Sequence, residues 1–200
     1  LTENDDITLV NLEGVLYEPK ELSTSHLVFN GPQDYAKILT EGSVEIVNLA
    51  NNHTDDYGKP GYQSTVEALQ AEGIAYSGDT DFGRDLFWFD FDNDVRIGFI
   101  GLSSTYDSDI KRVEKRARIL KEEQGCDLGV VSLNWGDNKT QPGAGQVVFA
   151  KEVIDAGHTL LESGTLLDFT TFQVQPWLDI PTIGSTVIAI AKDADSAKAS

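Results

Sequence analysis

Four amphipathic segments that each end at a glycine are the feature that most limits how this chain can fold. Each glycine suits the left-handed position that closes a helix, and each is followed by a short run of residues that favour strands. These glycines are Gly42, Gly73, Gly125 and Gly157. Repeated helix-then-strand units predict an α/β fold in which helices pack on a largely parallel sheet.

The four predicted helices carry apolar side chains at helical spacing. The first begins at Pro32, and the others span residues 60–72, 109–124 and 145–156. The side chains predicted to face the sheet are Tyr35, Ile38 and Leu39, then Tyr62, Val66 and Leu69, then Ile110, Val113, Ala117 and Leu120, and last Val148, Val153 and Ile154. Strands are predicted directly after them, at residues 44–50, 74–78, 127–133 and 158–164.

Further strands are predicted outside these repeats. The run ITLVNL at residues 7–12 is typical of a strand buried on both faces, and LFWFDF with RIGFIGL indicates a β-hairpin. Residues 172–191 suggest one or two more strands, interrupted by Pro176 and Pro181. Because no linker rich in Gly, Ser or Pro divides the chain, residues 1–200 are predicted to form a single α/β domain.

Composition excludes several classes of function. The formal charge is −18, with 33 acidic and 15 basic residues, which argues against nucleic acid as a partner. The single cysteine, Cys126, excludes a disulfide framework and favours a buried, unreactive thiol. No apolar run is long enough to span a membrane. The chain begins at Leu1 and lacks methionine, which indicates a fragment from which an anchor or targeting segment could have been removed.

Polar side chains gather where three predicted strands end. Ligands bind outside the carboxyl ends of parallel strands, and carboxylate, amide and imidazole groups together suit Mn²⁺, Mg²⁺ or Zn²⁺. The alternative is a polar loop in which Thr54 or Asp56 caps the next helix. His26 and His158 are predicted to be surface or packing residues. The gathered residues are Asn11 and Glu13, then Asn48, Asn51, Asn52, His53 and Asp56, and then Asn134, Trp135 and Asp137.

A family resemblance rests on motifs in a fixed order. The segments TLVNLEGVL, LVFNGPQDYAKIL and VEIVNLANNHTDDYGKPGYQSTVEALQAEGIAYSG come first, followed by RIGFIGLSS, LGVVSLNWGD and QVVFAKEVIDAG. Together they resemble the bacterial capsule-synthesis protein family of poly-γ-glutamate biosynthesis, known as CapA or PgsA. The resemblance covers residues 5–157, and the most specific signal is NLEG paired with LANNHTDDYG.

This resemblance implies a layered α/β sandwich similar to calcineurin-like metallophosphoesterases. In that fold, loops at the strand ends hold two divalent metals that activate a water for attack on a phosphoester. Glu13 matches the bridging acidic ligand, Asn52 a metal-binding amide, and His53 a histidine that contacts the metal site and protonates the leaving group or steadies the oxyanion. Asp56 matches a carboxylate that orients the His53 ring.

The chain also departs from the family pattern. It begins after the point where a Gly-Asp pair is expected, and Asn134 stands where the family has the histidine of a His-Trp-Gly motif. The final histidine-rich motif is replaced by LESGTLLDF. Asp137, Asp168 or Asp179 are the candidate substitutes for the missing ligands.

Three functions therefore remain open. The first is an accessory of capsule polymer synthesis or export, with a partly degenerate metal site, acting with other capsule-synthesis proteins at the outer face of the membrane or as a secreted protein. The second is an active metal-dependent phosphoesterase or related hydrolase that uses Mn, Zn, Fe or Mg. The third is a metal-free domain that binds an anionic or sugar-like ligand through residues such as Asn11, Asn51, Asn134, Trp135 and Asp137.

Overall fold

The chain forms an α/β fold, as the sequence predicts, in a computed structural model that describes residues 7–21, 27–78, 86–91, 95–103, 107–135, 148, 152, 167–173 and 185–193. It divides into two compact units, Leu1–Asp85 and Leu86–Ser200, and each is described by itself. That residues 1–200 form a single domain stays a prediction.

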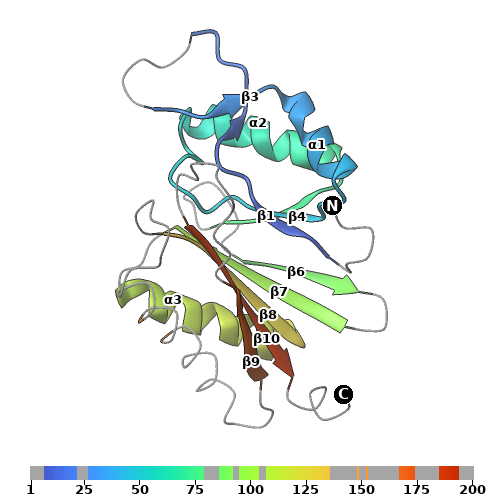
Figure 1. Cartoon of the computed structure of the whole chain (residues 1–200), viewed down its shortest axis with the longest axis vertical. Coiled ribbons are helices and arrows are strands. Elements are labelled where there is room, and N and C mark those ends of the chain that lie inside the picture. Colours follow the sequence, from blue (N-terminus) through green and yellow to red (C-terminus); the bar gives the residue numbers. More distant parts are fainter. Residues whose placement is uncertain are drawn as a thin grey trace. The chain divides into compact units, whose positions relative to one another are not determined.

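The first unit contains a three-stranded parallel sheet in the order β1-β4-β5. Its strands are β1 (Leu9–Asn11), β4 (Ile46–Asn48) and β5 (Ala75–Ser77). Two short strands, β2 (Val15–Leu16) and β3 (Asn30–Gly31), form a separate parallel pair. Figure 1 shows the helices α1 and α2 together on one face of the three-stranded sheet. They are α1 (Ala36–Glu41), preceded by the 3₁₀ turn η1 (Gln33–Tyr35), and α2 (Gly58–Ala71).

The core of the first unit lies between its sheet and α2. Leu69 and Val47 are completely buried there, and Leu39 and Val66 pack against the same cluster. The predicted face of the first helix is partly wrong, because Tyr35 and Ile38 are 53% and 62% exposed. The segment begins as a 3₁₀ turn, whose tighter winding changes which residues face inward.

Strand position decides burial within this sheet. The central strand β4 is buried along its whole length, whereas the side chains of β1 are only partly buried. The prediction that residues 7–12 form a strand buried on both faces is therefore wrong, since β1 lies at the edge of the sheet.

The second unit contains a five-stranded sheet in the order β6-β7-β8-β10-β9. The predicted hairpin is confirmed, and so is one late strand, Ser185–Asp193, whereas the strand Leu167–Gln173 lies almost wholly before the predicted segment 172–191. Only the β7/β8 pairing in this sheet is parallel. The prediction of a largely parallel sheet thus holds for the first unit alone, because the hairpin and the late strands return antiparallel. The strands are β6 (Leu86–Phe91), β7 (Val95–Leu102), β8 (Leu128–Trp135), β9 (Leu167–Gln173) and β10 (Ser185–Asp193).

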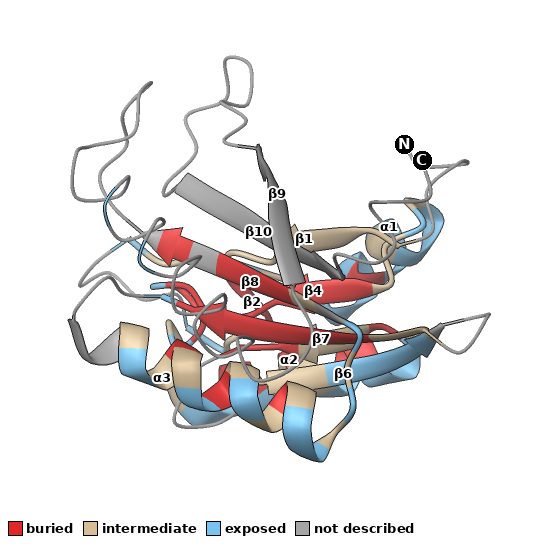
Figure 2. Cartoon of the chain, turned by 90° about the horizontal axis from the view of Figure 1, so that it is seen from below, coloured by how far each residue is buried: buried red, intermediate tan, exposed pale blue. Residues whose placement is uncertain are grey.

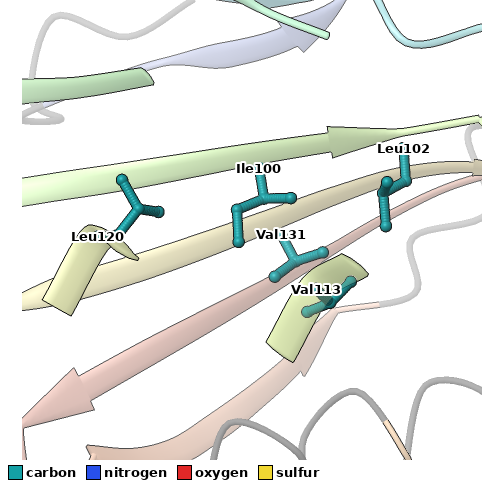
Figure 3. Close-up of a cluster of buried hydrophobic side chains, with 5 residues drawn as sticks. All are labelled: Ile100, Leu102, Val113, Leu120 and Val131. Carbon is teal, nitrogen blue, oxygen red and sulfur yellow. The ribbon is translucent and has the colours of Figure 1, made fainter. Parts of the chain in front are cut away.

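Helix α3 (Asp107–Arg118), which continues as a π-helical turn at Ile119–Glu123, packs on this sheet. Figure 3 shows the five side chains of its buried cluster, Ile100, Leu102, Val113, Leu120 and Val131. In Figure 2 the buried residues of α3 form a stripe along the helix, beside the buried length of β7. The predicted apolar face of the third helix is confirmed, because Ile110 and Ala117 also pack against this cluster.

Gly98 on β7 lets this helix approach the sheet closely. A Cβ atom at residue 98 would lie 2.7 Å from Cδ1 of Leu120, closer than such atoms can pack. The Leu120 side chain would therefore have to shift to admit a side chain at position 98.

The fourth predicted helix is described only at Val148 and Glu152, both in helical conformation. Val148 is 54% exposed, so its predicted place on the buried face is wrong. Val153, Ile154 and the strand predicted at residues 158–164 lie outside the described residues.

Candidate functional site

The carboxyl ends of β1, β4 and β5 bring three polar residues into one row. Asn11 pairs in register with Asn48, and Asn48 pairs with Ser77. Because side chains alternate along a strand, this row lies on the face opposite Val47, whose side chain packs under α2. Asn48 and Ser77 are 0% and 1% exposed, and within the described residues the Ser77 hydroxyl has no hydrogen-bond partner. Sequence reasoning missed Ser77, although its place at the end of the third strand was an available signal.

Asn51 connects the loops that follow β1 and β4. Its Nδ2 donates to Oδ1 of Asn11 at 3.2 Å and to the carbonyl of Leu12 at 2.9 Å. Its Oδ1 accepts from the backbone N–H of His53 at 3.0 Å and from the Thr54 hydroxyl at 3.1 Å. Since Asn51 is 5% exposed, its amide group serves as an internal brace instead of facing a ligand in solvent.

Asn11 extends this network to the predicted acidic ligand. Its Nδ2 donates to Oε2 of Glu13 at 3.1 Å, while its own Oδ1 is occupied by Asn51. Hydrogen bonds therefore run without a break from Glu13 through Asn11 and Asn51 to His53. Residues predicted from two separate motifs are brought together in one site.

His53 and Asp56 form a buried pair beside this network. Nδ1 of His53 lies 2.9 Å from Oδ2 of Asp56, and their side chains are 7% and 5% exposed. The same Asp56 oxygen accepts the backbone N–H of Phe29 at 2.6 Å. The predicted arrangement, a carboxylate positioned to orient the His53 ring, is the geometry observed.

The alternative explanation of this loop as a helix cap is wrong for its proposed residues. The N-cap of α2 is Tyr57, which makes no side-chain capping hydrogen bond. The Thr54 hydroxyl instead lies within hydrogen-bond reach of both the Leu49 carbonyl and Oδ1 of Asn51, and Asp56 is engaged by His53 and Phe29. These residues stabilise the loop itself.

Gly78 brings the end of β5 against the same loop. A Cβ atom there would lie 2.9 Å from the backbone nitrogen of Ala50 and 3.0 Å from the carbonyl carbon of Leu49. The absence of a side chain therefore allows the two chain segments to touch directly, just before the polar loop begins.

The donor set in the described part of the chain does not fit a two-metal centre. No three His, Cys, Asp or Glu side chains gather there in a way that could hold a metal ion. The amide oxygens of Asn11 and Asn51 already accept hydrogen bonds, and Nδ1 of His53 faces Asp56. Of the predicted ligands, Glu13 accepts a hydrogen bond from Asn11 and Asn52 offers an exposed amide, so the described oxygen donors are too few for two hard cations. A divalent metal stays a prediction.

The other predicted site residues belong to the second unit. Asn134, which is 4% exposed, and Trp135 end β8, and Asp168 lies in β9. Asp137 and Asp179 lie outside the described residues, as do His26 and His158, which were predicted to be surface or packing residues. The described site residues that lie close together all belong to the first unit.

In the described part of the chain, no helix is long and apolar enough to cross a membrane.

Comparison with known proteins places this site in a family. The chain matches the family model described as "Bacterial capsule synthesis protein PGA_cap" over residues 1–161. It is 26% identical over 186 residues to the capsule biosynthesis protein CapA of Bacillus anthracis, a match covering 80% of this chain and 44% of that protein. It is 27% identical over 184 residues to a probable polyglutamine synthesis accessory protein of Mycobacterium tuberculosis, covering 76% of this chain and 47% of that protein.

The chain spans about half the length of the curated relatives it matches, 44% and 47%. The family match itself extends over most of the chain and includes both the NLEG segment and the His53 loop. This chain therefore belongs to the bacterial capsule synthesis protein family.

Proposed function

We propose that this chain is part of an accessory protein for the synthesis or export of a bacterial capsule polymer, of the poly-γ-glutamate kind. Family membership supports the pathway; one relative is named for capsule biosynthesis and the other as a probable accessory of polyglutamine synthesis. The protein would act at the outer face of the membrane or as a secreted protein, together with other capsule-synthesis proteins.

The observation that carries the accessory role is the state of the asparagines at the strand ends. Asn11 and Asn51 hydrogen-bond to each other and to neighbouring groups of the protein. A rigid polar loop of this kind suits recognition of a partner, whereas a two-metal hydrolase needs several carboxylates and histidines directed at one point.

Charge limits what the accessory can hold directly. A chain with a formal charge of −18 repels a polyanion such as poly-γ-glutamate. We therefore expect the protein to act on the synthesis or export machinery and not to grip the polymer itself.

The test is complementation in the organism that carries the gene, scored as cell-bound polymer. Deletion should lower the polymer, and the full-length protein with Glu13→Gln or His53→Ala should restore it. Lys37→Ala, on an exposed helix, is the control for expression and handling. Failure of both site variants, when each is folded and present at normal level, would reject the accessory role in favour of catalysis.

A metal-dependent hydrolase is the second candidate, and the buried pair of His53 and Asp56 favours it. A histidine oriented by a carboxylate is a common arrangement for proton transfer. Elemental analysis of protein purified without chelator tests this candidate. About one to two equivalents of Mn, Zn or Fe per chain, lost in Glu13→Gln and Asn52→Ala, would support it.

A further inference from the structure

Phe29 makes contact with both members of the buried pair. Its backbone N–H donates to Oδ2 of Asp56 at 2.6 Å, and its ring lies 4.2 Å from the His53 ring, centre to centre, at 41°. One residue thus holds the carboxylate through its backbone and the imidazole through its side chain.

The NLEG segment in turn holds Phe29. The backbone N–H of Val15 donates to the Phe29 carbonyl at 3.0 Å. Gly14 has φ of +124°, and a Cβ atom there would lie 2.9 Å from Cβ of Phe29 and 3.0 Å from its carbonyl oxygen. The glycine therefore provides the space that lets Phe29 reach Asp56 and His53.

The shared oxygen of Asp56 determines where the proton lies on His53. Oδ2 already accepts the amide N–H of Phe29, so it is an acceptor toward the imidazole as well. In the neutral ring, Nδ1 must then carry the hydrogen, and Nε2 is left with its lone pair for a ligand or a proton. Among the described residues, no hydrogen bond from another side chain engages Nε2.

We propose that Phe29 is a positioning residue: it holds Asp56 against the His53 ring, which favours the tautomer with hydrogen on Nδ1 and leaves Nε2 as the nitrogen that can meet a ligand. This inference rests on the proposal that the strand ends of the first unit form the functional site. It assigns a role to the LVFNG segment. It also explains why Gly14 of NLEG lies directly before β2, the strand that pairs with the LVFNG segment.

The experiment is ¹⁵N NMR of the histidine side chains at a pH where the rings are neutral. The chain has three histidines, so His26→Gln with His158→Gln leaves a single signal from His53. The unaltered Phe29 protein should show hydrogen on Nδ1, and finding it on Nε2 would overturn the proposal.

Two variants then test Phe29 itself. Phe29→Leu keeps the backbone hydrogen bond and removes the ring, and Phe29→Ala removes the side chain beyond Cβ. Each should raise the fraction of the other tautomer and speed exchange of the Nδ1 hydrogen, by about two- to tenfold for a lost aromatic contact. Leu27→Ala, at a 64% exposed position in the same segment, is the matched control and should leave both values unchanged.

Loss of folding and loss of the positioning role of Phe29 can be told apart. If Phe29→Ala does not fold, Phe29→Leu carries the test, with Asp56→Asn showing how the spectrum looks once the carboxylate is lost. Unchanged tautomer and exchange in a folded Phe29→Leu protein would overturn the role of the ring. Since the measurement needs neither polymer nor turnover, it can fail while the capsule role stands, and the reverse also holds.

Discussion

Among the described residues, the side-chain hydrogen bonds of the two units lie mostly at different ends of their parallel strands. In the first unit, hydrogen bonds between side chains and loops gather after the strands, around Asn51 and Asp56. In the second, they gather before β7 and β8, where Arg96 binds Asp90 and the carbonyl of Gln124, and its backbone N–H donates to Asp127. Hydrogen bonds before the strands hold neighbouring strands together, whereas hydrogen bonds after the strands order the loops where ligands bind in parallel sheets. The contacts around Asn51 and Asp56 lie where parallel sheets bind ligands, so the proposed site belongs to the first unit.

The largest expected effect comes from truncating each core. Leu69→Ala in the first unit and Leu102→Ala in the second should each lower the free energy of unfolding by about 2–5 kcal/mol, because both side chains are fully buried. Hydrogen exchange followed unit by unit checks whether each variant loosens mainly its own unit. Equal loosening of both units by either variant would mean that they unfold together. Ile38→Ala, at an exposed position, is the control.

The brace at Asn51 should matter next. Asn51→Ala leaves the carbonyl of Leu12 and the N–H of His53 without their partner, which costs about 1–3 kcal/mol for each buried group left unsatisfied. Its exposed neighbour provides the matched control, since Asn52→Ala should change the free energy of unfolding by less than about 0.5 kcal/mol. Urea denaturation of the two variants measures the difference, and equal stability would show that Asn51 is not a brace.

The reactivity of the Cys126 thiol reports on packing in the second unit. Burial raises the pKa of its thiol from 9.0 to about 11, opposed by nearby Arg96. At pH 8 a pKa two units higher leaves about a hundredfold less thiolate, partly offset by greater nucleophilicity, so a disulfide reagent should react about tenfold more slowly than with unfolded chain. Equal rates would contradict this.

The same shift gives a pH dependence with a definite sign. A thiol whose pKa is raised by folding favours the folded state fully below the unfolded value of 9.0. That contribution is lost as the pH rises through about 11, because the unfolded chain ionises first. Cys126→Ser should therefore weaken the alkaline loss of stability, measured as the change in melting temperature between pH 8 and a pH of about 10.

The smallest effect is expected at the exposed pair of Lys37 and Asp34. Nζ of Lys37 lies 2.8 Å from Oδ1 of Asp34 and lowers the pKa of that carboxyl, but both side chains are largely in solvent. The lowered pKa favours the folded state above the ordinary value and loses that effect as the pH falls, and solvent screening keeps it small. Lys37→Ala should leave the melting temperature unchanged at neutral pH, and a clear drop would show an unexpected role for η1 and α1.

Much of this fold could be predicted because the apolar spacing of its helices indicates their buried faces and the glycines mark their ends. The repeats ending at Gly73 and Gly125 have regular apolar spacing, and α2 and α3 pack as that spacing indicates. The prediction was partly wrong for the helix after Pro32, because a 3₁₀ turn changed which of its residues face inward. The pairing direction in the second sheet was missed because it depends on where distant strands insert, as β10 does between β8 and β9.

The site was predictable in its residue types more than in its contacts. Glu13, His53 and Asp56 could be named from the family resemblance, which also implied the pairing of His53 with Asp56. Asn51 was expected to bind substrate, but its amide is occupied inside the protein. Phe29 escaped notice because its contribution is a backbone N–H and a ring face, and neither can be recognised in a sequence without knowing what lies 27 positions away.

The contact between Gly98 and Leu120 ties two distant positions to a single shared volume. A larger residue at 98 requires the Leu120 side chain to move or to be replaced by a smaller one, so we expect substitutions at the two positions to be coupled. Comparing natural variants at positions 98 and 120 would test this coupling.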